Sequence, residues 1–108
     1  GYQGMKELFQ RHPDIDGVFA ANDLMAIGAL KAAYEWGCAV PDDLAIIGFD
    51  GIDISGLTVP RISTIQQPIY RMGELAMQEL LQEMQNPKTE AKHFELEVKL
   101  VVRESTMR

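Results

Sequence analysis

The sequence predicts an α/β domain in which a parallel sheet is flanked by helices. Two short runs are almost wholly apolar, at residues 18–21 and 44–49, as in strands buried on both faces of a parallel sheet. Between these runs, apolar residues recur at helical spacing from Leu24 to Tyr34. Two strands joined through a helix form a right-handed crossover, so a strand, helix and strand unit is expected over residues 18–49.

One helix is expected before the first strand and one after it. Met5, Leu8 and Phe9 fit one face of a short helix over about residues 2–11. The helix after the first strand is expected to end at Gly37, because glycine commonly caps helix C-termini.

The second half of the chain is predicted to hold a strand, a long helix and a final strand. β-Branched residues indicate a strand around residues 61–66, and Pro68 suits the first turn of a helix. From Phe94 to Val102 apolar and polar residues alternate strictly, which predicts a strand with one solvent-facing side. Core packing is the expected role of the apolar stripe on the helix, which comprises Ile69, Met72, Gly73, Ala76, Met77, Leu80, Leu81 and Met84.

Composition limits the possible functions. The 108 residues suit one domain or a piece of one, and the absence of an initial Met indicates a piece of a longer protein. A net charge of −6 without a basic cluster does not suit binding to nucleic acid phosphates. Cys38 is the only cysteine, which excludes an intrachain disulfide and fits a reducing cytoplasm. No apolar run approaches the roughly 20 residues that a membrane helix needs.

The sequence does not show the signals of an enzyme. No nucleophile stands with a base, and the glycines at 48, 51 and 56 fit neither a dinucleotide fingerprint nor a phosphate loop. His12 and His93 have no ligand-like companions. We therefore expect no catalytic residue, no metal and no cofactor.

Three polar residues follow predicted strands. Asn22 comes after the first strand, Asp50 after the second, and Gln67 after the third. Ligands of open α/β sheets bind beyond the carboxyl ends of the strands. Amide groups that donate and accept, together with an acceptor carboxylate, suit a neutral polyhydroxy ligand.

Each of these positions also has a purely local interpretation. Asn22 or Asp23 can cap the following helix, and capping is the expected role of Asp23. Asp50 can form an Asx-turn into the following glycine. Gln66 or Gln67 can cap the helix that begins near residue 69. Local pattern alone leaves these alternatives open.

Four motifs in fixed order resemble the C-terminal half of the effector-binding core of LacI/GalR-family bacterial transcription repressors. These motifs are "VFAANDLMAIGAL", "VPDDLAIIGFDGID", "PRISTIQQPIYRMGELAMQELL" and "LVVRESTMR". The resemblance covers essentially the whole chain. It implies a partial type I lobe like those of periplasmic binding proteins, in which two α/β lobes enclose a ligand cleft.

The resemblance also implies domain boundaries. Residues 1–65 would belong to the C-terminal lobe and residues 66–68 to a hinge crossover. Residues 69–92 would form a helix and loop of the N-terminal lobe, and residues 93–108 a strand returning to the C-terminal lobe. The DNA-binding segment, hinge helix and first lobe of the family would lie outside this chain.

By the same resemblance, Asn22, Asp50 and Gln67 would contact a small sugar-like or nucleobase-like effector, and the parent protein would be a cytoplasmic regulator. Operator DNA would be bound through the absent N-terminal domain. Homodimer contacts would come from the helix after the Asn-Asp motif and from the loop before the third strand, namely from Ile27, Leu30, Tyr34, Leu57, Thr58 and Val59.

Two other functions compete with this one. A periplasmic sugar-binding protein of an ABC transporter would have the same fold and cleft, although the "RISTIQQP" and "LVVRES" motifs favour the repressor. A small α/β enzyme with Asp50 as a base would be supported by a phosphate-binding glycine loop, which the sequence lacks.

Overall fold

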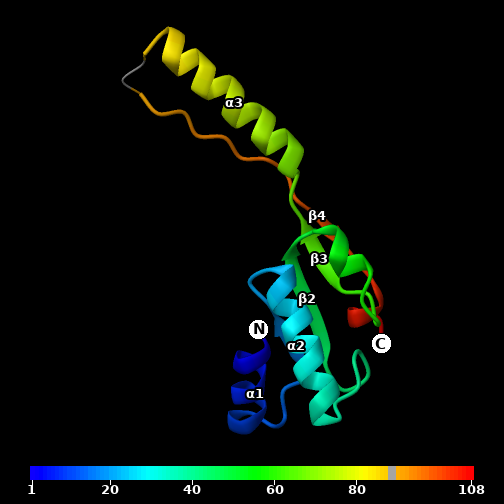
Figure 1. Ribbon diagram of the computed structural model, residues 1–108. Coiled ribbons are helices and arrows are strands. Elements are labelled where there is room, and N and C mark those ends of the chain that lie inside the picture. Colours follow the sequence, from blue (N-terminus) through cyan, green and yellow to red (C-terminus); the bar gives the residue numbers. More distant parts are fainter. Residues whose placement is uncertain (88–89) are drawn as a thin grey trace. The chain divides into compact units, whose positions relative to one another are not determined.

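The computed structural model describes residues 1–87 and 90–108 and divides into two compact units, Gly1–Gln66 with Lys99–Arg108 and Gln67–Val98. The elements of the first unit are α1 (Tyr2–Arg11), β1 (Gly17–Phe19), α2 (Asp23–Trp36), β2 (Ala45–Asp50), the 3-10 helix η1 (Asp53–Gly56), β3 (Ser63–Gln66), β4 (Lys99–Val101) and the 3-10 helix η2 (Glu104–Thr106) (Figure 1). The second unit contains α3 (Ile69–Gln85).

The sheet has four strands in the order β1-β2-β3-β4. The first three strands are parallel, and β4 runs antiparallel to β3. Asp50 pairs with Gln66 at the carboxyl ends of β2 and β3, so both strands end at the same edge of the sheet. The predicted α/β class and the parallel crossover from β1 through α2 to β2 are therefore confirmed.

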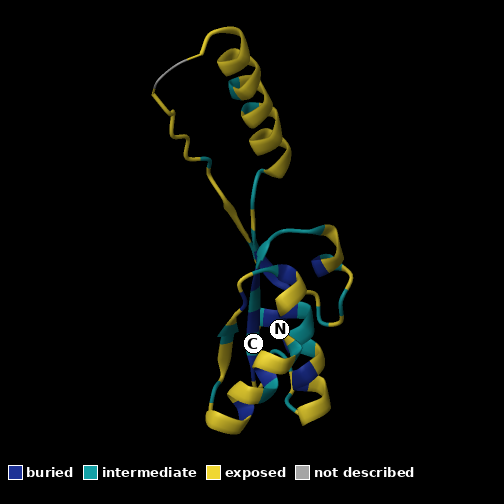
Figure 2. Ribbon diagram, turned by 60° about the vertical axis from the view of Figure 1, so that its left-hand side comes forward, coloured by how far each residue is buried: buried dark blue, intermediate teal, exposed yellow. Residues whose placement is uncertain are grey.

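The core lies between α2 and one face of the sheet. Four alanines of α2 are buried, at 26, 29, 32 and 33, and they pack with Leu44 and Ile46. Small side chains let the helix approach the strands closely. The helix α1 adds Met5 and Phe9 to this core, as its apolar spacing predicts. The ring of Phe9 stacks on that of Trp36, with 5.3 Å between the ring centroids. Figure 2 shows that the buried segments lie in the first unit.

The first strand is not buried on both faces, which corrects the expectation from its apolar run. Phe19 at its end is 63% exposed and makes an edge-to-face contact with Phe49 at 6.5 Å. Gly48 faces α2 at Asp23 and Ala26, whereas its neighbour Phe49 points to the opposite face. The residues of β2 on that opposite face, Ile47 and Phe49, are half-buried, whereas Ile46 and Gly48 on the face toward α2 are buried.

The second unit departs further from the sequence expectations. None of the residues of α3 is buried, so its apolar stripe does not pack in a core formed by the described residues. The predicted strand from Phe94 to Val102 is realised only at Lys99–Val101. Residues 94–98 run beside a helix rather than beside a strand in the described part of the chain, and a strand requires a hydrogen-bonded neighbour. Residues 88–89, part of the expected polar loop, lie outside the described residues.

The glycine that ends α2 has a left-handed backbone conformation. Gly37 has φ +78° and its N–H donates to the carbonyl oxygens of Ala33 and Tyr34, as its predicted capping role requires. Replacing Gly37 with alanine should lower the free energy of unfolding by about 1–2 kcal/mol, because a side chain disfavours the left-handed conformation. Urea unfolding measures the change.

A matched control is available in α1. Gly4 lies within the helix with open space around its Cα, so Gly4→Ala should raise the free energy of unfolding by about 0.5–1 kcal/mol. A Gly37→Ala protein as stable as the parent would contradict the left-handed cap.

Candidate functional site

Asn22 caps helix α2. Its side-chain oxygen accepts a hydrogen bond from the backbone N–H of Met25 at 2.8 Å, and its backbone is extended, as at most N-caps. The side chain is half-buried and follows β1 at the carboxyl edge of the sheet. Its amide nitrogen makes no hydrogen bond within the described residues, so it can donate to a ligand.

Asp23 does not cap the helix, which corrects the role expected for it. The side chain is completely buried, and its Oδ2 accepts from the backbone N–H groups of Gly51 at 2.9 Å and Ile52 at 2.8 Å. Its Oδ1 accepts from the hydroxyl of Thr64 at 2.6 Å. Because Asn22 occupies the N-cap, Asp23 is the first helical residue, and its carboxylate reaches across to β2 and β3.

Glycine at position 48 makes room for this carboxylate. A Cβ at Gly48 would lie 2.3 Å from Oδ1 of Asp23 and 3.2 Å from the Cβ of Ala26. The first distance is far below van der Waals contact. A residue with a side chain at this point of β2 would therefore displace the carboxylate or the whole of α2.

Asp50 occupies a strained backbone position. It is the last residue of β2, half-buried, with φ +116°, a region that residues with a Cβ seldom adopt. Such strain costs about 1–3 kcal/mol and is found mostly at functional sites. The next residue, Gly51, also has a positive φ of 78°, and the turn directs two successive amides at Asp23. Hydrogen bonds to a charged group contribute about 1.5–3 kcal/mol each, enough to offset the strain.

Gln67 is the first residue of the second unit and directly follows β3. It is half-buried and lines a groove within that unit. Pro68 holds the N-cap position of α3 and provides no side-chain cap. Gln66 packs instead against Gly51, because a Cβ on Gly51 would lie 2.6 Å from the Cγ of Gln66.

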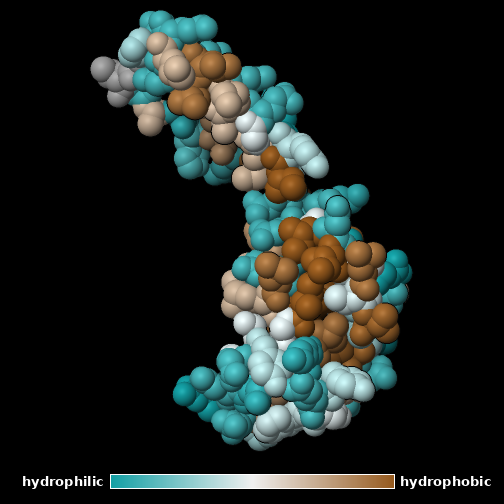
Figure 3. Space-filling view, viewed as in Figure 1, coloured by the Kyte–Doolittle hydropathy of each residue, from teal (hydrophilic) through white to brown (hydrophobic). Residues whose placement is uncertain are grey.

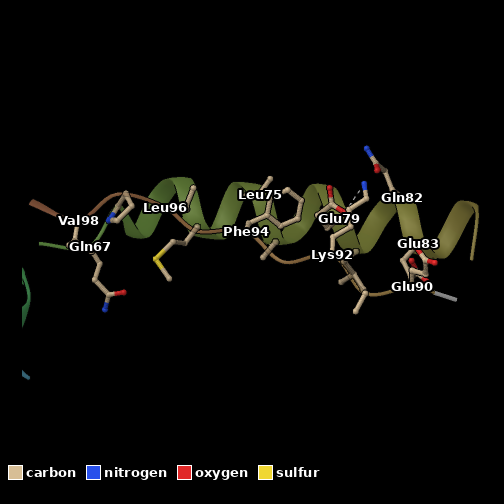
Figure 4. Close-up of a pocket in the computed structure, with 15 residues that line it drawn as sticks. Gln67, Leu75, Glu79, Gln82, Glu83, Glu90, Lys92, Phe94, Leu96 and Val98 are labelled. Carbon is tan, nitrogen blue, oxygen red and sulfur yellow. Dashed lines mark ion pairs between the residues drawn. The ribbon is translucent and has the colours of Figure 1, made fainter. Parts of the chain in front are cut away.

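The groove of the second unit has a volume of about 720 Å³. It lies between α3 and residues 90–98, which run alongside the helix (Figure 4). Leu75, Phe94 and Leu96 contribute apolar walls, and Lys92 pairs with Glu79 at 3.4 Å. The groove is therefore formed mainly by the apolar side of α3, none of whose residues is buried. Its polar side chains do not converge on one point.

Sequence reasoning assigned no role to the residues that anchor the C-terminal segment. The hydroxyl of Ser105 accepts from the N–H of Ser63 at 2.8 Å and donates to the carbonyl of Ile46 at 2.6 Å. Arg103 donates through Nη1 to the hydroxyl of Ser55 at 2.9 Å and to the carbonyl of Ile62 at 2.8 Å. These contacts tie the chain end to β2, β3 and η1, and the motif "LVVRES" was the available signal.

An ion pair strengthens this anchor at the surface. The guanidinium of Arg61 donates through Nε to both carboxylate oxygens of Glu104, at 2.8 and 2.9 Å. These hydrogen bonds lower the pKa of the Glu104 carboxyl below its ordinary value.

The residues predicted to contact a second copy fall into two groups. Ile27 and Leu30 are half-buried and pack against the core. Tyr34, Leu57 and Val59 are 84%, 79% and 93% exposed. The hydroxyl of Thr58 donates to the carbonyl of Pro60 at 2.7 Å and so shapes the loop. Figure 3 shows apolar side chains gathered on one face of the first unit.

The described residues include neither a metal-binding cluster nor a membrane-spanning helix. Within residues 1–87 and 90–108, no three His, Cys, Asp or Glu side chains form a group that could hold a metal ion. In the same residues no helix is long and apolar enough to span a membrane.

An open sheet with polar residues at the carboxyl ends of its strands is the arrangement found in ligand-binding α/β domains. Residues 1–106 match the family described as periplasmic binding protein-like domain, and the chain belongs to this family.

Three similar proteins make the relationship more specific. The ribose operon repressor of Halalkalibacterium halodurans is 43% identical, over 94% of this chain and 30% of that protein. The structure of the transcriptional regulator CelR with cellobiose has a TM-score of 0.92 at 36% identity, over 96% of this chain and 32% of that one. The structure of the Lac repressor dimer bound to operator and the anti-inducer ONPF has a TM-score of 0.88 at 29% identity. The match covers 99% of this chain and 32% of that one.

These similarities confirm the resemblance to the effector-binding core of LacI-family repressors. The chain spans about a third of the length of the proteins it matches.

The close approach of β2 to Asp23 can be tested by substitution. Gly48→Ala should lower the free energy of unfolding by about 1–3 kcal/mol, because the added methyl group overlaps the carboxylate. Chemical denaturation measures the loss. Gly17→Ala is the matched control, since Gly17 is also a strand glycine but has open space around it. Equal stability of the two variants would show that β2 tolerates a side chain at position 48.

Proposed function

We propose that this chain is the sugar-sensing part of a LacI-type transcriptional regulator. The observation that carries the proposal is the strained Asp50 at the carboxyl end of β2, held by hydrogen bonds from the next two residues to a buried carboxylate. Backbone strain that the surroundings maintain is characteristic of binding sites. The similarity to a ribose operon repressor and to a regulator bound to cellobiose points to a sugar as the ligand.

Asn22, Asp50 and Gln67 are the proposed ligand contacts. The carboxylate of Asp50 accepts hydrogen bonds from sugar hydroxyls, whereas the amide nitrogen of Asn22 donates one because its oxygen is already engaged by Met25. Gln67 directly follows β3, whose end pairs with that of β2. Its amide both donates and accepts, as a polyhydroxy ligand requires.

In this function the chain does no chemistry on its ligand. A sugar that binds one conformation of the protein more tightly than another shifts the population between them, and thereby changes the affinity for operator DNA. DNA would be bound by a separate domain outside this chain, in the cytoplasm. The relatives are named as repressors and regulators, which favours this function over a transporter's sugar-binding protein and over an α/β enzyme.

We propose that the two units belong to the two lobes that the family resemblance implies. In this assignment residues 1–65 belong to the C-terminal lobe, residues 66–68 are the crossover, residues 69–92 belong to the N-terminal lobe, and residues 93–108 return to the C-terminal lobe. The second unit extends to Val98, six residues beyond the proposed boundary. The exposed apolar stripe of α3 supports this assignment, because an apolar surface of that length is normally covered in a complete protein.

We also propose that the protein is a homodimer. The exposed apolar residues of the first unit include Tyr34 on α2 and Leu57 and Val59 after η1. Apolar side chains that protrude this far are enriched where two copies meet. Ile27 and Leu30 would border the interface from the same helix while packing against the core.

The ligand contact is tested by Asp50→Ala in the protein as its gene encodes it, titrated calorimetrically with ribose and with cellobiose. Loss of a charged hydrogen-bond acceptor costs about 1.5–3 kcal/mol, so the affinity should fall by about 10- to 150-fold. Asp53→Ala is the control, since Asp53 is an exposed carboxylate three residues away. Unchanged affinity in a folded Asp50→Ala protein would overturn the assignment.

The dimer is tested by Leu57→Glu and Val59→Glu. A charge at the centre of an apolar interface is not solvated, so each variant should sediment as a monomer at concentrations where the parent is a dimer. Both side chains are exposed in the single chain, so folding should be unaffected. Met107→Glu, another exposed apolar position, is the control and should remain dimeric. An intact dimer in both test variants would contradict the interface.

A further inference from the structure

Two buried side chains that are not among the proposed ligand contacts form hydrogen bonds to the turn that follows Asp50. We infer that Asp23 and Thr64 are positioning residues for the ligand site, which hold the Asp50 carboxylate in its binding orientation. This inference rests on the proposed function, because Asp50 must contact the ligand. Neither Asp23 nor Thr64 touches the ligand in this scheme, and both act through Asp50.

The turn is held from two sides. Oδ2 of Asp23, on α2, accepts from the N–H groups of Gly51 and Ile52 at 2.9 and 2.8 Å. The hydroxyl of Thr64, on β3, donates to Oδ1 of Asp23 at 2.6 Å and accepts from the N–H of Gly51 at 3.2 Å. The amide of Gly51 is therefore shared between a carboxylate and a hydroxyl. Two separate elements, α2 and β3, therefore converge on the residues that directly follow Asp50.

Because Asp23 and Thr64 are buried, the loss of any of these hydrogen bonds is costly. Asp23 and Thr64 both have no exposed surface, so water does not replace a lost partner. Hydrogen bonds to a charged group are also stronger in a medium of low dielectric constant. Removing the Thr64 hydroxyl would leave the carboxylate one donor short and would free it to change its orientation.

The strained backbone at Asp50 links the hydrogen bonds to Asp23 with the position of the Asp50 side chain. Asp50 and Gly51 have φ values of 116° and 78°, and these direct the two following amides toward Asp23. Without an acceptor at that point, Asp50 would relax to a negative φ, which residues with a Cβ prefer. Its carboxylate would then leave the position where it meets the ligand. Loss of these hydrogen bonds should thus weaken binding beyond any general loss of stability.

The neighbouring residue on β3 supplies a matched control. The hydroxyl of Ser63 is also buried, but its partners are the N–H of Arg103 at 2.7 Å, the carbonyl of Arg103 at 3.0 Å and the hydroxyl of Thr106 at 2.6 Å. None of these belongs to the turn after β2. Ser63→Ala therefore removes a buried hydroxyl from the same strand without disturbing the hydrogen bonds to the turn that follows Asp50.

The experiment compares Thr64→Val, Thr64→Ser, Ser63→Ala and Asp50→Ala in the protein as its gene encodes it. Calorimetric titration with ribose and with cellobiose gives the affinity, and thermal unfolding gives the stability. Thr64→Val should lower the affinity about tenfold. Thr64→Ser, which keeps the hydroxyl, should restore it to within about twofold of the parent, and Ser63→Ala should stay within the same range despite a comparable loss of stability.

Amide hydrogen exchange at Gly51 and Ile52 gives a second readout that needs no ligand. Thr64→Val should accelerate exchange at both amides, whereas Ser63→Ala should not, because only the first variant loosens the carboxylate that accepts from them. Unchanged exchange in Thr64→Val would overturn the inference. So would an equal loss of affinity in Thr64→Val and Ser63→Ala, since that result follows from stability alone.

The two proposals fail in different ways. If Asp50→Ala weakens sugar binding and Thr64→Val does not, the positioning role is wrong and the proposed ligand contact stands. If Asp50→Ala binds both sugars as the parent does, the ligand contact is wrong and the positioning role falls with it. If the parent binds neither sugar, the proposed function is contradicted for these ligands, and amide exchange decides whether Asp23 and Thr64 hold the turn.

Discussion

The carboxylate of Asp23 constrains more of this structure than any other single group. A charge with no exposed surface requires hydrogen-bond donors, and it takes them from the two amides after β2 and from a hydroxyl on β3. Its size requires glycine at position 48. One buried charge therefore fixes the distance of α2 from the sheet, the path of the chain after β2, and the choice of residue on two strands.

The elements themselves could be predicted because they depend on local pattern. Apolar periodicity and the capping glycine gave α1 and α2 nearly at their observed bounds, and the run at residues 44–49 gave β2. The roles of Asn22 and Asp23 could not be assigned in this way. To know which residue caps α2, one has to know the start of the helix to within one position. The hydrogen-bond partners of Asp23 lie 28 to 41 residues away in the sequence, so local pattern does not reveal them.

The remaining errors share a physical cause. Apolar spacing shows which face of an element is to be covered, but it does not show which segment covers it. The exposure of Phe19, the unburied stripe of α3 and the missing strand at residues 94–98 all occur where no covering element or strand neighbour lies among the described residues. The ligand contacts were predicted from strand ends, and they stay a prediction because strand-end position is shared by many α/β domains.

The adjacent pair at the start of α2 divides two tasks that one residue could not perform. Asn22 accepts with its oxygen from one open amide of the first helical turn, that of Met25, and in the proposed function its nitrogen is left for a ligand. Asp23 is one position further along α2, where its side chain points into the core. Its carboxylate accepts hydrogen bonds from the turn that carries Asp50. In the proposed function, the end of a single helix thus supplies one ligand contact and positions another. A change in the position of α2 would alter both contacts together, which is the property that a ligand-controlled regulator requires.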